Sequence, residues 1–128
     1  MGHTTTTKCL DCGNKFFVDH GGGFTFHLLR CDKCGKAKSI GFDKLGDLHV
    51  RYVKGLPGPY CIASAQHDRA IQKNASVKPI SEKEYHKGVQ VKAGKCRCGG
   101  RYKFDAPPRC PKCRSTKLEE GEDTIYYD

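Results

Sequence analysis

The residues best suited to chemistry in this chain of 128 residues are its nine cysteines. Eight of them form closely spaced pairs, with one or two residues between the members of each pair. A tetrahedral Zn²⁺ ion takes four ligands, and thiolate sulfurs bind it at about 2.3 Å. Each pair is therefore half of a metal site. The four pairs are Cys9 and Cys12, Cys31 and Cys34, Cys96 and Cys98, and Cys110 and Cys113.

Grouping each pair with its neighbour along the chain predicts two metal centres. Eighteen residues separate Cys12 from Cys31, and eleven separate Cys98 from Cys110. A short hairpin between two pairs would bring them to the same end of a small sheet. The predicted ligands are Cys9, Cys12, Cys31 and Cys34 in the first site, and Cys96, Cys98, Cys110 and Cys113 in the second, with one Zn²⁺ in each.

This pattern resembles the zinc ribbon family, twice. A glycine directly follows the second cysteine of three pairs, at Gly13, Gly35 and Gly99. Glycine lets the backbone curl so that its N–H groups can point at sulfur. The resemblance implies two structural four-cysteine sites on small β-hairpins and covers roughly half of the chain. The pair Cys96 and Cys98 departs from the commoner knuckle because it has one intervening residue.

Composition argues that metal must help to fold the chain. There is no tryptophan and one methionine, so a large apolar core is not expected. A ribbon of about 35 residues is too small to be stable by burial alone. A structural zinc ion contributes on the order of 10 kcal/mol to folding, so chelation should unfold these modules.

The sequence predicts an α+β fold in which two zinc-ribbon hairpin modules flank a mostly helical middle. No secretory signal or apolar run of membrane-spanning length is recognisable, which predicts a cytoplasmic location with reduced cysteines. We also expect a monomer. The expected segments are a flexible tail at 1–8, a first ribbon at 9–42, the helical middle at 43–94 and a second ribbon at 95–128.

Local patterns place the elements within these segments. Alternating apolar residues predict a hairpin over 15–30 that turns at 21–23, and a short strand at 40–42. Capping and breaking residues predict helices from Asp43 to Gly55, over 64–74, and from the capping box at Ser81 to near Gly88. The second ribbon is expected to hold a strand at 101–104 and a closing hairpin of 116–119 with 124–127 around Gly121.

Four cysteines saturate a tetrahedral ion, so these sites leave no position for water or substrate. The histidines are scattered, and none has a neighbouring motif that assigns it a catalytic role. We therefore expect a non-catalytic binding module with no catalytic residues and no small-molecule substrate. The histidines considered are His20, His27, His49, His67 and His86.

Charge gives the best indication of a partner. The formal net charge is +9, and two zinc-thiolate centres would lower it to about +5. Eight basic residues and one acid lie between Lys95 and Lys117, a composition that suits phosphate contacts, with Tyr102 as a candidate for base stacking. The predicted contact surface is Arg97, Arg101, Tyr102, Lys103, Arg109, Lys112 and Arg114.

Four alternatives stay open at this point, one of them a catalytic site of unassigned residues among 43–94. The basic residues could merely neutralise the thiolates or pair across strands with the acids beyond them, Glu119, Glu120, Glu122, Asp123 and Asp128. The sequence leaves the partner undecided between a protein, bound by a zinc adaptor module, and a nucleic acid. Finally, Cys-Pro-x-Cys at 110–113 resembles rubredoxin, which implies an electron carrier with iron at the second site.

Overall fold

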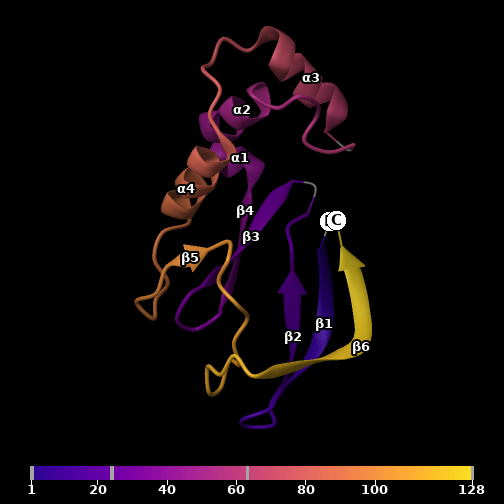
Figure 1. The fold of residues 1–128 in the computed structure, drawn as a ribbon, viewed down its shortest axis with the longest axis vertical. Helices are drawn as coiled ribbons and strands as arrows, with labels where there is room; N and C mark the ends of the chain where they lie inside the picture. The colour runs from indigo at the N-terminus through magenta and orange to yellow at the C-terminus, as the bar shows by residue number, and fades with distance from the viewer. Residues whose placement is uncertain (1, 24, 63, 128) are drawn as a thin grey trace.

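The computed structural model describes residues 2–23, 25–62 and 64–127, and it confirms the α+β class. In this described part of the chain, strands lie at both ends and four helices lie in the middle (Figure 1). The elements are β1 (Gly2–Cys9), β2 (Lys15–His20), β3 (Phe26–Cys31), β4 (Ala37–Gly41), α1 (Phe42–Leu45), α2 (Asp47–Lys54), α3 (Ala65–Asn74), α4 (Glu82–Ala93), β5 (Tyr102–Lys103) and β6 (Leu118–Tyr127).

The first sheet has the order β2-β1-β6 and is antiparallel throughout. The predicted flexible tail is wrong, because residues 2–9 form the central strand of this sheet. Threonine is β-branched and favours strands, and Thr5 and Thr7 alternate inward with Cys9. The predicted closing hairpin around Gly121 is also wrong: β6 is one strand that pairs with β1 along its length.

Gly121 lies in a β-bulge of β6 rather than in a turn. The register shifts between Thr5, which faces Thr124, and Thr7, which faces Glu120. A Cβ at Gly121 would lie 2.5 Å from the Oγ1 atom of Thr6. A residue without a side chain is therefore required where β6 crosses Thr6.

The second sheet has the order β4-β3-β5. The predicted hairpin over 15–30 is wrong, because β2 pairs with β1 whereas β3 pairs with β4 and β5. Residues 21–23 connect two different sheets. The tight turns of both sheets are instead the cysteine knuckles themselves, between β1 and β2 and between β3 and β4.

The helical middle agrees with the sequence in outline. Gly46 adopts a φ of 54° and divides the predicted first helix into α1 and α2. The Ser81 side chain accepts a hydrogen bond from the Glu84 N–H and caps α4 as expected. This helix continues past Gly88 to Ala93, and Gly88 gives room for Leu48, because a Cβ there would lie 2.8 Å from a Leu48 methyl carbon.

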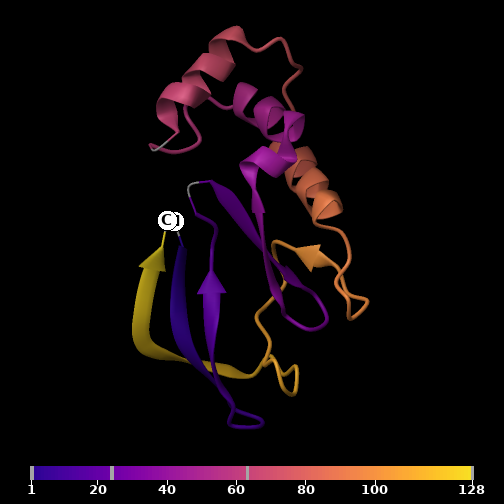
Figure 2. The same ribbon diagram turned by 180° about the vertical axis from the view of Figure 1, so that it is seen from behind.

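The main core lies between the second sheet and the helices. It includes Leu29, Leu45, Tyr85 and Val89, which are all at most 1% exposed, and it continues into Cys31 and Cys96. The view from behind shows the helices gathered at one end, with the first sheet extending from the other (Figure 2). None of the helices in the described part of the chain has the length and apolar character that a membrane crossing requires.

Candidate metal centres

All four cysteine pairs sit on knuckles with the same backbone frame. In each one, the N–H of the residue after the second cysteine donates to the carbonyl of the first. These bonds run from Gly13 to Cys9 (2.9 Å), Gly35 to Cys31 (3.0 Å), Gly99 to Cys96 (3.0 Å) and Arg114 to Cys110 (2.8 Å). The knuckle at Cys96 has the same backbone hydrogen bond, closed over a turn that is one residue shorter. Its unusual spacing therefore does not prevent it from forming a knuckle.

The donor of this bond has a positive φ in every knuckle. Gly13, Gly35 and Gly99 have φ values of 75°, 74° and 93°, and Arg114 has 63°. Arg114 is the single non-glycine residue with positive φ among the described residues. An L-amino acid in this region costs roughly 1–2 kcal/mol, so the fourth knuckle carries strain that the other three avoid.

The four knuckles pair into two clusters in a different way from the one that the sequence predicts. Cys9 and Cys12 lie with Cys110 and Cys113, whereas Cys31 and Cys34 lie with Cys96 and Cys98. The predicted membership of both sites is therefore wrong, although the same eight cysteines are used. We call the first cluster the outer site and the second the inner site, because the inner ligands lie between the outer ones in sequence.

Strand pairing explains this nesting. The partner of β1 is β6, and Cys9 faces Leu118, so the start of β6 brings the knuckle of Cys110 to that of Cys9. The partner of β3 is β5, and Cys31 faces Tyr102, which brings Cys96 to Cys31. Grouping by sequence neighbours fails because β2 and β3 diverge into separate sheets.

Both clusters fit a tetrahedral metal ion. Within each, all four Sγ atoms lie within 4.8 Å of one another. The Sγ–Sγ distances are 3.5 Å for Cys9 and Cys113, 3.5 Å for Cys12 and Cys110, 3.3 Å for Cys31 and Cys98, and 3.6 Å for Cys34 and Cys96. Bonds of about 2.3 Å in a tetrahedron place sulfurs about 3.8 Å apart, so each set can hold one ion with little rearrangement.

Hydrogen bonds to sulfur favour the thiolate form of some of these cysteines. The N–H of Cys98 and the Tyr102 hydroxyl lower the pKa of Cys96 to about 6. At Cys110, desolvation opposes ionisation, but the N–H groups of Cys113 and Lys112 outweigh it and lower the pKa to about 6. Desolvation and neighbouring sulfurs raise the pKa of Cys34 to about 12. Four adjacent thiolates repel one another, and a bound cation removes that conflict.

Tyr102 is not available for base stacking. Its side chain is 7% exposed, and it packs in the main core beside the inner site. The Lys38 ammonium lies 5.1 Å from the centre of its ring. The prediction that Tyr102 forms part of a contact surface is therefore wrong, and its role is to support the inner site.

The predicted basic residues differ in how free they are. Arg97, Arg101, Lys112 and Arg114 are exposed. Lys103 forms an ion pair with Asp32, with 3.3 Å between Nζ and Oδ2. Arg109 is half-buried and donates through Nη1 to the Arg114 carbonyl at 3.1 Å, so it holds the strained knuckle.

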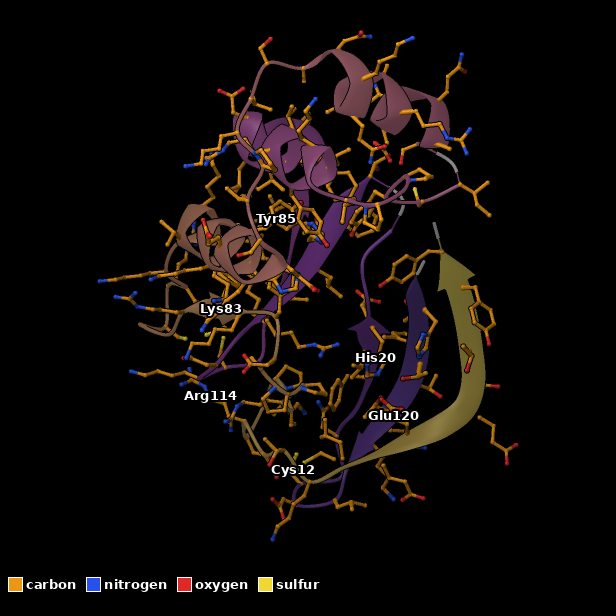
Figure 3. All side chains as sticks on the ribbon, turned by 45° about the horizontal axis from the view of Figure 1, so that its top comes forward. Cys12, His20, Lys83, Tyr85, Arg114 and Glu120 are labelled. Atoms are coloured by element: carbon orange, nitrogen blue, oxygen red, sulfur yellow. The ribbon has the colours of Figure 1, made fainter. Side chains whose placement is uncertain are left out.

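The acidic residues after Lys117 do not pair with the basic residues of the predicted contact surface. Glu119 and Glu120 lie on β6, opposite residues of β1 rather than β5, and Glu120 pairs with His20. Figure 3 shows Lys83 and Arg114 projecting on one side of the molecule, while Glu120 and His20 lie on the sheet at the other. Asp128 lies outside the described residues.

Sequence reasoning missed a hydrogen-bonded chain of three side chains in the core. The Tyr85 hydroxyl lies 2.7 Å from Nε2 of His27 and 2.7 Å from Nδ1 of His49. One hydroxyl thus joins β3, α2 and α4. Burial lowers the pKa of His27 to about 4, assisted by the positive potential of His49 and His86. No local motif signals this chain, because its members are 22 or more residues apart.

The fold and the clusters define a small α+β protein with two groups of four cysteines, each of which could hold a metal ion. The chain belongs to a family described as a domain of unknown function, DUF8255, whose model matches residues 5–119. That range contains all eight clustered cysteines. No curated protein and no solved structure shows a significant match to the chain.

Proposed function

We propose that this protein is a non-catalytic nucleic-acid-binding module held together by two structural zinc ions. Zinc suits the ligands because sets of four cysteines are typical of closed structural sites. The ions fasten knuckles that come from distant parts of the chain. The exposed basic residues of the second half then contact phosphate.

Separation of charge is the observation that carries this proposal. Among the described residues, Lys103 is the one member of the predicted basic surface within 4.0 Å of a carboxylate. The acids of β6 lie on a different sheet. Basic side chains without acidic partners leave a positive potential that attracts polyanions.

The backbone of Arg114 adds a second line of support. Glycine occupies the equivalent position in the other three knuckles and avoids the cost of a positive φ. Strained residues tend to occur where a particular side chain is needed for function. Arg114 is exposed and has no carboxylate partner among the described residues, so its guanidinium is free for a phosphate.

Native mass spectrometry tests the proposal. Protein expressed in medium with balanced metals would be measured alone and with a strand or duplex of about 20 nucleotides, at two salt concentrations. We expect the mass of two zinc ions and a complex that weakens as salt rises. Absence of any complex at low salt with the zinc sites filled would overturn nucleic-acid binding.

A rubredoxin-like iron site is a second candidate, and the outer site is the one that suits it. Cys110-Pro-Lys-Cys113 combines with Cys9 and Cys12 rather than with the short Cys96 knuckle. Both halves of the outer site therefore have the two-residue spacing that the resemblance to rubredoxin requires. Ferric thiolate is red and zinc thiolate is colourless, so an absorption spectrum of the purified protein separates the two.

A protein partner is the third candidate, and it would use the first sheet. Phe17 and Ile125 are 70% and 65% exposed. They face Thr6 and Thr4 in the register, so both project from the same face of the sheet. Replacing both with serine would abolish binding to a protein at this face and leave a nucleic-acid complex intact.

A further inference from the structure

A groove of about 360 Å³ lies between α4 and the strand β5, next to the inner metal site. The charged residues in its lining are Lys87, Lys95, Arg101 and Lys103, and no carboxylate lines it. A second hollow, lined in part by Lys83, continues from it and shares Lys87 and Gln90. We call the two together the basic groove.

Most of the positive charge in the basic groove has no acidic partner. Lys103 pairs with Asp32, whereas Lys83, Lys87, Lys95 and Arg101 have no carboxylate within 4.0 Å among the described residues. All four are exposed. The one acid in the lining of the second hollow, Glu82, lies 3.9 Å from His86.

The walls of the basic groove fix the backbone positions of these cationic residues. Lys83 and Lys87 are one helical turn apart on α4, about 6 Å along its axis. Lys95 and Arg101 face each other across an isolated antiparallel bridge. Gln90 joins the two walls, because its Oε1 atom accepts the Phe104 N–H at 3.2 Å.

The groove offers charge, and the one Phe, Tyr or Trp side chain in its lining is buried. Tyr102 lines it, yet its side chain is 7% exposed. Base stacking needs an accessible aromatic face, whereas phosphate contacts need donors and positive charge. The occupant that fits is therefore a run of phosphates rather than a set of bases.

We propose that the basic groove binds the phosphodiester backbone of a nucleic acid, with Lys87, Lys95 and Arg101 as its principal contacts. This inference rests on the proposed function and adds α4 to the contact surface. Binding is independent of base sequence, and it extends from the inner metal site along α4 to Lys83.

The experiment measures binding of a fluorescein-labelled DNA duplex of mixed sequence by anisotropy, over a range of salt concentrations. The test variant is Lys87→Gln with Lys95→Gln. The matched control is Lys73→Gln with Lys78→Gln, which removes the same charge from exposed lysines outside the groove lining. Circular dichroism and zinc content confirm that each variant is folded.

Each lysine that contacts one phosphate adds about 0.9 to the slope of log affinity against log salt. We expect the test variant to lose about two units of slope and at least about tenfold in affinity near 0.1 M salt, while the control binds like the wild type. Equal binding by the test variant and the control would overturn the proposal that the basic groove contacts the phosphates, and would leave the proposal of nucleic-acid binding standing. A wild-type protein that binds no duplex, including one that binds only a protein, would overturn both.

Discussion

Gly35 and Arg109 lie in contact where the two metal sites meet. A Cβ added to Gly35 would fall 2.7 Å from both the backbone nitrogen and the Cβ of Arg109. Gly35 follows Cys34 of the inner site, and Arg109 precedes Cys110 of the outer site. The two knuckles therefore touch through backbone, and a change in one displaces the other.

The first prediction compares two glycines with the same backbone. Gly35 and Gly13 have φ values of 74° and 75°, but nothing lies within 4 Å of a Cβ at Gly13. Gly13→Ala should cost about 1–2 kcal/mol in free energy of unfolding, from backbone strain alone. Gly35→Ala should cost about 1–3 kcal/mol more, because Arg109 must move. Thermal and denaturant unfolding of the zinc-loaded proteins measure the difference, and equal costs would show that the knuckles do not constrain each other.

Arg114 gives a prediction in which stability and binding change in opposite directions. Arg114→Gly removes the strain of a positive φ, offset in part by the greater freedom of glycine in the unfolded chain. We expect a gain of up to about 1 kcal/mol in stability together with weaker binding to DNA. Arg114→Gln is the control, because it removes the charge and keeps the strain. Tighter DNA binding by Arg114→Gly would contradict the proposed contact.

The pattern of cysteines made the ligands predictable, but not their grouping. Spacing within a pair is a local property, and it identified all eight clustered cysteines and the glycines at 13, 35 and 99. Grouping depends on which strands pair, and the threonine run at 4–7 gave little sign that β1 is central. The capping box at Ser81 was recognisable because it is local. The chain of His27, Tyr85 and His49 was not, since its members meet only after the helices pack on β3.

The nested grouping predicts the effect of removing one ligand. Cys113→Ser should leave one bound metal ion and loosen the start of β6, because the outer site anchors that strand beside Cys9. Cys61→Ser is the control, since Cys61 lies in neither cluster. Native mass spectrometry gives the metal count, and hydrogen exchange reports protection in β6 and β1. Loss of protection around Cys96 and in β5, with β1 and its knuckle intact, would instead support the grouping by sequence neighbours, in which Cys113 joins Cys96 and Cys98.

The Tyr85 hydroxyl should stabilise the core through its two imidazole partners. Tyr85→Phe leaves nitrogen atoms of the buried His27 and the half-buried His49 without that partner, at up to about 1–3 kcal/mol for each. Tyr52 is a matched control, because its ring stacks on Tyr85 at 4.0 Å between centroids and no hydrogen bond of its hydroxyl is found among the described residues. Tyr52→Phe should change stability by less than about 0.5 kcal/mol. Similar losses of stability in the two variants would show that the hydrogen bonds of the Tyr85 hydroxyl with His27 and His49 do not stabilise the core.

His27 makes the stability of the core depend on pH. Its pKa in the folded protein is about 4, lowered by burial and by the potential of His49 and His86, against about 6.5 when unfolded. The unfolded state therefore binds a proton first as pH falls, and the contribution of neutral His27 is complete above about pH 6.5 and declines towards about pH 4. Tyr60 also faces the hydrogen-bonded side chains of His27, Tyr85 and His49, and Asp68 lies near His49.

Acid also protonates the cysteine ligands, so the effect of His27 must be measured as a difference. The free energy of unfolding would be determined for the wild type and His27→Gln at several pH values between about 7 and 5, where both retain their metal. We expect the advantage of the wild type to be largest near pH 7 and to shrink as pH falls, because glutamine does not titrate. A constant difference across this range would show that His27 has the same proton affinity in the folded and unfolded states.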